Sequence, residues 1–210
     1  NFLLQITELL EHNDFLTAQS QKMREFYKYM AKEYPYLSFA FKGRIKSLIR
    51  AEAKFNGYVV EYIYDYYEKH ATYPSVVELG EKLNCFRDLI AYRIVISMPK
   101  CHVKDKKERE NQEIKYLYEI ANVLKDFLEE RGFTAEPAGG VKKSTSELLR
   151  EEVRPYYRDY ITNVDPDGYR SLHITFFDNS AKCYMEMQLR TKQMDDIAET
   201  VSYTHLRAHE

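Results

Sequence analysis

The sequence predicts an α+β fold in which a mixed β-sheet is flanked by helices. Apolar residues recur at steps of three and four over residues 2–36 and again over 113–131, which is the period of amphipathic helices. Residues 89–98 form a continuous apolar run rich in β-branched side chains, typical of a buried strand. Residues 169–177 and 182–190 alternate apolar and polar side chains, which indicates a hairpin.

The first half of the chain is expected to be mainly helical. Residues 2–36 predict a helical hairpin, with Asn13 or Asp14 capping its second arm. Residues 43–70 predict another long helix, which can break at Asn56-Gly57, and 75–83 predict a short one. The expected divisions are an N-terminal helical segment (1–40), the main domain (41–199) and an atypical C-terminal tail (200–210).

The second half combines loops with the hairpin. Residues 101–113 are charged and loop-like, the helix over 113–131 stops at Gly132, and 138–157 form a long polar loop of the kind that is often functional. If residues 178–181 form the hairpin loop, Phe177 pairs with Lys182, and His173 then lies directly opposite Glu186 on the polar face.

Composition excludes several classes of protein. The 210 residues are 44% hydrophobic and 30% charged, with only 7 Gly and 6 Pro, as in a soluble globule. No apolar run reaches the roughly 20 residues of a membrane span, so we expect no membrane partner and a cytoplasmic protein. A formal net charge of −2 argues against binding duplex nucleic acid. Three cysteines without a CxxC pair indicate neither a disulfide framework nor a cysteine-rich zinc site.

The residues that suggest chemistry are basic and acidic side chains in separate segments. Residues 42–54 carry five basic residues and one acidic residue, a local charge of +4. A triphosphate suits such a row, although a solvated helix face is the more economical interpretation of this segment alone. The chain also has two carboxylates, Asp88 and Glu186, and an aromatic residue, Tyr169, after a glycine turn. Together with the basic segment, these residue types are the ones that Mg²⁺-assisted phosphoryl or pyrophosphoryl transfer requires. No GxxxxGK or GxGxxG motif is present, which argues against a P-loop enzyme and a Rossmann dehydrogenase.

Five ordered segments resemble the motifs of RelA/SpoT-type (p)ppGpp synthetase domains, in particular those of small stand-alone alarmone synthetases. They are residues 43–47 (GRIKS), 88–93 (DLIAYR), 158–161 (RDYI), 168–173 (GYRSLH) and 186–191 (EMQLRT). The resemblance implies a nucleotidyltransferase-like mixed sheet and transfer of the β,γ-pyrophosphate of ATP to the 3′ hydroxyl of GDP or GTP, with Mg²⁺ as cofactor. Small synthetases of this type often form symmetric oligomers, so the resemblance is compatible with a homo-oligomer.

The resemblance also implies roles for individual residues. Asp88 and Glu186 match the catalytic acids and metal ligands. The residues that match the ATP side are Arg44, Lys46, Lys54 and Arg93. The residues that match the acceptor-nucleotide side are Arg158, Tyr169, His173, Gln188 and Arg190, with Tyr169 as the aromatic that stacks on guanine.

Two departures from the family pattern leave alternatives open. Asp165 and Asp167 stand where the family commonly has Lys and Asn, and acids beside an anionic nucleotide would repel it unless they point away. An adenine nucleotide or the 3′ end of tRNA is therefore an alternative acceptor. A nucleotide-binding regulator without turnover is a second alternative, against which the presence of both Asp88 and Glu186 argues.

Overall fold

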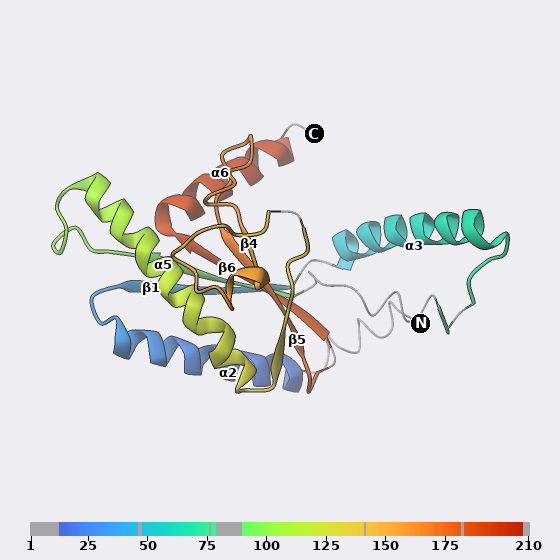
Figure 1. The fold of residues 1–210 in the computed structure, drawn as a ribbon, viewed down its shortest axis with the longest axis horizontal. Coiled ribbons are helices and arrows are strands. Elements are labelled where there is room, and N and C mark those ends of the chain that lie inside the picture. The colour runs from blue at the N-terminus through green and yellow to red at the C-terminus, as the bar shows by residue number, and fades with distance from the viewer. Residues whose placement is uncertain are drawn as a thin grey trace.

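The computed structural model describes residues 13–45, 48–75, 77–78, 90–140, 142–181 and 183–207. Within these ranges the side chains of 13–20, 44–45, 48–56, 58–59 and 201–207 are not described. The elements are α2 (Asn13–Glu33), β1 (Ser38–Ile45), α3 (Leu48–His70), β2 (Ile90–Ser97), α5 (Lys106–Glu129), β3 (Phe133–Glu136), the 3₁₀ helix η1 (Arg154–Tyr156), β4 (Tyr157–Asp159), β5 (Leu172–Asp178), β6 (Cys183–Thr191) and α6 (Lys192–Arg207) (Figure 1).

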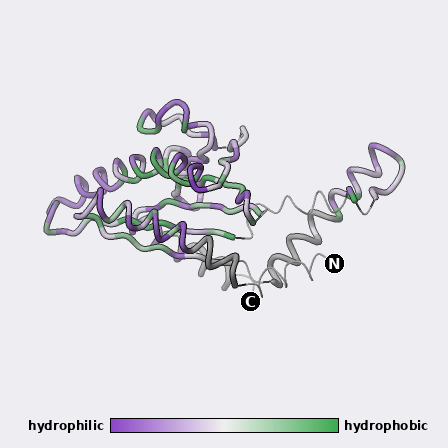
Figure 2. The backbone as a smooth tube through the Cα atoms, turned by 90° about the horizontal axis from the view of Figure 1, so that it is seen from below, coloured by the Kyte–Doolittle hydropathy of each residue, from purple (hydrophilic) through white to green (hydrophobic). Residues whose placement is uncertain are grey.

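The described strands form one mixed sheet in the order β1-β2-β6-β5-β3, with β4 also paired to β5. Strands β2 and β6 run parallel, whereas the other pairs are antiparallel. Turned by 90°, the strands lie as a layer between helices (Figure 2). The predicted α+β fold with a helix-flanked mixed sheet is therefore confirmed.

The core lies between one face of the sheet and helices α2 and α5. Helix α5 buries a stripe at helical spacing that includes Leu117, Leu124 and Leu128, and α2 adds Met23, Phe26 and Met30. The strands contribute alternate residues to the same core. Helix α2 is the expected second arm of the N-terminal hairpin, and residues 1–12, where the first arm was expected, lie outside the described residues.

The segment before α3 corrects the predicted helix over 43–70. Gly43, Arg44 and Ile45 belong to β1, an edge strand paired along its whole length with β2, and the helix begins only at Leu48. It then runs to His70 without a break at Asn56-Gly57. Phe39 and Phe41 pack against the core, but Gly43, the next residue on the same face, has no side chain, so the apolar alternation stops before the basic end of the strand. At Gly43 a Cβ atom would lie 3.0 Å from Cε1 of Tyr92, so glycine permits the close approach of β1 to β2.

Helix α3 projects away from the sheet (Figure 1). Its described side chains include exposed aromatic and aliphatic residues, among them Val60 and Tyr64. Ser75 and Glu78 then form a reciprocal capping box, in which Glu78 N donates to Ser75 Oγ at 3.2 Å and Ser75 N donates to Glu78 Oε2 at 2.8 Å. This capping box marks the start of the helix predicted over 75–83. Residues 79–83 lie outside the described residues.

Helix α5 begins earlier than the sequence pattern predicts. Asp105 is its N-cap, since its carboxylate accepts a hydrogen bond from Glu108 N at 2.8 Å, and the helix includes residues 106–112 that were expected to be a loop. Gly132 follows the helix with φ = +89°, as expected for a glycine stop. The first two turns of α5 extend beyond the core and carry charged residues. They therefore lack the apolar period by which a helix is recognised from sequence.

The hairpin forms, but with a register two residues away from the predicted one. Asp178 pairs with Cys183, so the loop is 179–182 rather than 178–181, and Glu186 lies opposite Thr175 instead of His173. His173 pairs with Gln188. Because the shift is even, His173 and Glu186 still share a face and become diagonal neighbours.

The C-terminal helix α6 continues to Arg207, past residue 199, at which the main domain was expected to end. Residues 200–207 therefore follow on from the domain as helix, and the domain boundaries themselves stay a prediction. Within the described ranges, no helix combines the length and apolar character that crossing a membrane requires.

The packing predicts that α2 is part of the same folding unit as the sheet. Phe26 is fully buried and lies edge-on to Phe127, with ring centroids 5.0 Å apart. We expect Phe26→Ala to lower the free energy of unfolding by about 3–5 kcal/mol, measured by urea denaturation, while the exposed-site control Lys28→Ala changes it by less than about 0.5 kcal/mol. A loss below about 1 kcal/mol for Phe26→Ala would mean that α2 is an appendage.

Candidate functional site

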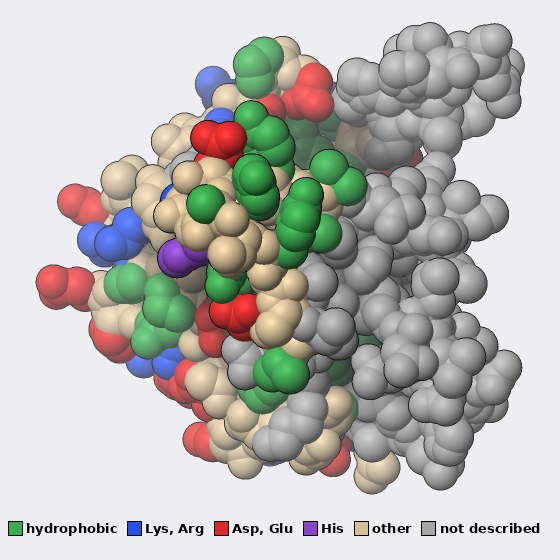
Figure 3. Space-filling view, turned by 90° about the vertical axis from the view of Figure 1, so that its right-hand side faces the viewer, with side chains coloured by type: hydrophobic (Ala, Val, Ile, Leu, Met, Phe, Trp, Pro, Cys, Tyr) green, Lys and Arg blue, Asp and Glu red, His purple; other side chains and the backbone are tan. Residues whose placement is uncertain are grey.

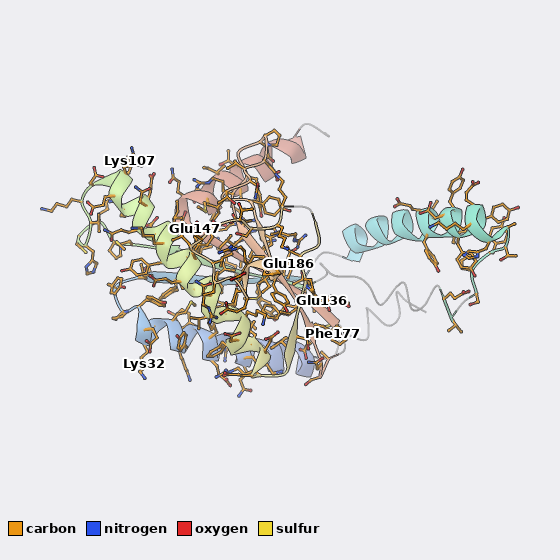
Figure 4. All side chains as sticks on the ribbon, in the orientation of Figure 1. Lys32, Lys107, Glu136, Glu147, Phe177 and Glu186 are labelled. Atoms are coloured by element: carbon orange, nitrogen blue, oxygen red, sulfur yellow. The ribbon has the colours of Figure 1, made fainter. Side chains whose placement is uncertain are left out.

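Strand β6 divides its side chains between the two faces of the sheet. Its apolar residues are fully buried beneath the helices, and its polar residues point to the opposite face. The buried set is Met185, Met187 and Leu189, and the opposite set is Glu186, Gln188 and Arg190. Arg93 on β2 and His173 on β5 both pair with Gln188, so the three stand side by side across three strands. Glu186 lies in the middle of the sheet, whereas Lys32 and Lys107 lie at the periphery (Figure 4).

Glu186 is held by neighbours on both carboxylate oxygens. Arg158 Nη2 donates to Oε2 at 2.6 Å and Gln188 Nε2 donates to Oε1 at 2.7 Å, while Nδ1 of His173 lies 3.6 Å from Oε1. Burial raises the pKa of Glu186, but its contacts with His173, Gln188 and Arg158 outweigh burial and hold the pKa well below its ordinary value. The resting carboxylate is therefore ionised and is a weak base.

His173 connects Glu186 to Tyr169 and Arg190. Burial lowers the pKa of His173, so the imidazole is neutral near pH 7. Tyr169 Oη lies 2.8 Å from His173 Nε2 and accepts a hydrogen bond from Arg190 Nη2. Since the guanidinium can only donate, the consistent assignment has the tyrosine hydroxyl donating to Nε2 and the His173 proton on Nδ1, facing Glu186.

The ring of Tyr169 packs within an aromatic group. Tyr160 contacts it edge-on at 5.5 Å between centroids, and Arg190 Cζ lies 4.9 Å from its centroid. The turn before it is closed by a hydrogen bond from Gly168 N to Asp165 O at 2.8 Å, and Gly168 has φ = +81°, a conformation that favours glycine. The turn thus positions Tyr169 directly over Arg190.

Arg158 is positioned by its neighbour Asp159, a fully buried carboxylate at the end of β4. Tyr118 Oη and Ser144 Oγ donate to its Oδ2 at 2.8 and 2.7 Å. The backbone N–H groups of Ile161 and Thr162 donate to Oδ1 at 2.9 and 3.0 Å. Four donors to one carboxylate fix the turn after β4, and strand alternation then directs Arg158 to the polar face.

Beyond Arg190 the network reaches β2 and β1 through Asp195 of α6. Arg93 Nη1 donates to Asp195 Oδ1 at 2.9 Å, Arg190 Nη1 donates to the same oxygen at 3.3 Å, and Lys42 Nζ donates to Oδ2 at 3.0 Å. Four cationic side chains, Lys42, Arg93, Arg158 and Arg190, thus face one side of the sheet. This arrangement suits a polyanion such as a nucleotide.

The structure brings together most of the residues predicted from sequence. Arg93, Arg158, Tyr169, His173, Glu186, Gln188 and Arg190 belong to one connected polar network. The predicted residues Asp88 and Lys46, and the side chains of Arg44 and Lys54, lie outside what is described.

The sequence prediction missed Asp195 and the contact that Lys42 makes with it. The signal for Asp195 is an acidic residue on the buried stripe of an amphipathic helix, next to Met194 and one turn before Ala198, which are also buried. A buried acid requires a basic partner. Lys42 was part of the basic segment, but its role depends on residues 42–45 being a strand.

The two acids that depart from the family pattern, Asp165 and Asp167, both have local partners in the structure. Lys142 Nζ lies 2.7 Å from Asp165 Oδ1, which neutralises this carboxylate. Asp167 Oδ1 accepts a hydrogen bond from Tyr169 N at 2.9 Å, so it stabilises the turn. The expected repulsion of an anionic acceptor by these two acids is therefore weakened by their local contacts.

Divalent metal binding is supported by the chemistry of Glu186 alone. An ionised carboxylate is a ligand that suits Mg²⁺, and Oε2 of Glu186, which accepts one hydrogen bond from Arg158, has a second lone pair. Within the described part of the chain, no three His, Cys, Asp or Glu side chains gather to hold a metal. Because Asp88 lies outside that part, the two-carboxylate magnesium site stays a prediction.

A groove on the other side of the molecule has a different character. It lies between α2 and α5, has a volume of about 610 Å³, and is lined by aromatic rings, including Tyr29 and Tyr34, and by the acids Glu119, Asp126 and Glu130. The lining also includes Arg150, but its three acids outnumber this one base, which disfavours phosphate groups. Over the face drawn in Figure 3, acidic and basic side chains are interspersed with hydrophobic ones in the described residues. Compared with the acidic groove, the basic network on the sheet is the better candidate for a nucleotide site.

Comparison with known proteins agrees with this geometry. Residues 60–208 match the family model described as a region found in RelA / SpoT proteins, and the chain belongs to this family. No curated protein matches the sequence.

Two solved structures have similar folds. The small alarmone synthetase 1 from Bacillus subtilis bound to its product pppGpp has 16% identity and a TM-score of 0.51, over 99% of this chain and 83% of that one. The small alarmone synthetase 2 from Bacillus subtilis has 18% identity and a TM-score of 0.54, over 91% of this chain and 77% of that one. At these identities the likeness shows the fold.

The contacts of Asp159 predict a stability cost without a change in shape. Asp159→Asn replaces one carboxylate oxygen by an NH₂ group, which cannot accept a hydrogen bond. If the NH₂ group takes the place of Oδ2, it faces the two hydroxyl donors, and if it takes the place of Oδ1, it faces the two backbone N–H donors. We expect a loss of about 1–3 kcal/mol in the free energy of unfolding, measured by chemical denaturation. The exposed control Glu151→Gln should change it by less than about 0.5 kcal/mol. An equal effect of the two substitutions would contradict the anchoring role of Asp159.

Proposed function

We propose that the chain is a (p)ppGpp synthetase that transfers the β,γ-pyrophosphate of ATP to the 3′ hydroxyl of GDP or GTP. The observation on which this depends is the ionised Glu186 within a row of cations on one sheet face, contributed by β1, β2, β4 and β6. Membership of the RelA/SpoT family and a fold shared with two small alarmone synthetases support the proposal.

In the proposed reaction the 3′ oxygen of the acceptor forms a bond to the β-phosphorus of ATP. The bond from this phosphorus to the oxygen bridging the α-phosphate breaks, and AMP leaves with that oxygen. Arg93 and Lys42 would hold the donor phosphates, and Arg190 the acceptor, by charge-assisted hydrogen bonds. Mg²⁺, bound by Glu186 and Asp88, would supply further neutralisation of phosphate charge.

Glu186 would orient the 3′ hydroxyl and take its proton. In the resting protein its low pKa makes it a poor proton acceptor, and Arg158 is one cause. If a nucleotide phosphate drew Arg158 away, one of the contacts that lower the pKa of Glu186 would be lost, and the carboxylate would become a stronger base.

A guanine nucleotide is the preferred acceptor in this proposal. The alternative of an adenine nucleotide or a tRNA 3′ end was motivated by Asp165 and Asp167, and their contacts with Lys142 and the Tyr169 amide remove much of that motivation. Incubation with Mg²⁺ and ATP labelled at the γ-phosphate, followed by separation of the products, tests the assignment. We expect label on GDP or GTP, whereas label only on ADP or tRNA, or on no acceptor, would refute it.

Substitution of Glu186 predicts a catalytic defect without loss of binding. We expect Glu186→Gln to lower kcat by about two to four orders of magnitude with nucleotide Kd values changed less than about fivefold. Glu136→Gln is a matched control, because Glu136 is on the same sheet face, two strands away in register. A wild-type rate in Glu186→Gln, or an equal defect in both variants, would exclude the assigned role.

Two substitutions at Tyr169 separate its ring from its hydroxyl. Tyr169→Phe keeps the ring and its ring contacts but loses the hydroxyl contacts with His173 and Arg190, and Tyr169→Ala loses both the ring and the hydroxyl. If the ring stacks on guanine, Tyr169→Ala should raise the acceptor KM by about tenfold or more and the ATP KM by less than about threefold. Tyr169→Phe should raise the acceptor KM only a few-fold, which corresponds to the loss of about one hydrogen bond. Steady-state kinetics with each nucleotide varied provides the test, and equal increases in both KM values for Tyr169→Ala would contradict stacking.

A further inference from the structure

Asp195 is the point at which the two halves of the basic network meet. It lies in the first turn of α6, which begins after Thr191, whose Oγ1 accepts a hydrogen bond from Met194 N at 3.3 Å. The side chain of Asp195 is 2% exposed, in contrast to the 61% of its neighbour Asp196. The cap and the buried stripe of α6 therefore direct this carboxylate onto the polar face of the sheet.

Three cations from three strands share this single carboxylate. Lys42 of β1 contacts Oδ2, and Arg93 of β2 and Arg190 of β6 both contact Oδ1. The side chains of Arg93 and Arg190 are 16% and 4% exposed, so water screens them weakly. Arg93 also contacts Glu199 Oε1 at 2.5 Å, but that side chain is 61% exposed, so without Asp195 these like charges would still repel one another across adjacent strands.

The arginines that share Oδ1 belong to different parts of the proposed site. Arg93 matches the ATP side, and Lys42 lies beside it, whereas Arg190 contacts Tyr169 and Gln188 on the acceptor side. Asp195 is the described carboxylate that touches both groups.

We propose that Asp195 is a positioning residue that couples the ATP site to the acceptor site. The inference rests on the proposed function. When donor phosphates draw Lys42 and Arg93 toward themselves, Asp195 is left with Arg190 as its main partner and holds it more firmly. Arg190 then fixes Tyr169 and Gln188, so the acceptor meets a more ordered site. By linkage, the acceptor strengthens donor binding by the same factor.

The chain offers a matched control for this test. Asp196 is the next residue, has the same charge, and pairs with Lys192 on the exposed face of α6. Asp195→Asn and Asp196→Asn therefore change the net charge equally and alter the same helical turn. Only the first changes the carboxylate that bridges the cations.

The experiment measures the Kd of GDP by calorimetry with Mg²⁺ present, with and without a saturating non-hydrolysable ATP analogue. In the wild-type protein and in Asp196→Asn, we expect the analogue to tighten GDP binding by about fivefold or more. In Asp195→Asn the factor should fall to below about twofold, with weaker binding of each nucleotide alone. Wild-type coupling in Asp195→Asn, or equal loss in both variants, would overturn the proposal.

Circular dichroism first establishes that Asp195→Asn is folded at the temperature of measurement. If it is not, Lys42→Met replaces it, because the Lys42 side chain is 54% exposed and its loss spares the core. We expect Lys42→Met to weaken binding of the ATP analogue and to lower the coupling factor at least twofold, and an unchanged factor would overturn the proposal.

The two proposals can fail separately. If the wild-type protein transfers no pyrophosphate, but its coupled binding is lost in Asp195→Asn, the synthetase function is refuted and the coupling role stands. If the wild-type protein transfers pyrophosphate, but Asp195→Asn leaves the coupling unchanged, the coupling role is refuted and the synthetase function stands. Failure of the wild-type protein to bind either nucleotide would refute both.

Discussion

The polar site depends on the alternation of side chains along β6, the central strand that pairs with β2 on one edge and β5 on the other. Burial of Met185, Met187 and Leu189 against the helices fixes which face the intervening residues occupy. Glu186, Gln188 and Arg190 must then lie on the open face, beside residues of two neighbouring strands. The hydrophobic core and the candidate site are therefore two consequences of one strand register.

Electrostatics explains how so many cations are tolerated on that face. Glu186 balances Arg158, Asp195 balances Lys42, Arg93 and Arg190, and Glu199 is a second partner of Arg93, so the cations of this face are locally paired. In the proposed function, a nucleotide would bind there by exchanging these internal partners for phosphate oxygens. The cations are thus already in place when the ligand arrives, which lowers the cost of binding.

Much of this could be predicted from sequence, and the errors have physical causes. The hairpin, β2 and the shared face of His173 and Glu186 were predictable because apolar periodicity reports burial. The register was two residues off because Asp178 joins the strand, which alternation alone does not reveal. The end of β1, residues 43–45, was predicted to be helix because Gly43 interrupts the apolar alternation of the strand and basic residues follow it. Asp195 was missed because its partners come from three separate strands.

The central claim is that nucleotides bind on the polar face of the sheet formed by β2, β5 and β6. The most direct measurement is a structure of the protein with a non-hydrolysable ATP analogue and GDP. The account predicts phosphate oxygens in contact with Arg93 and Arg190 and a guanine base against Tyr169. Nucleotides bound instead in the groove between α2 and α5, beside Tyr34, would contradict it.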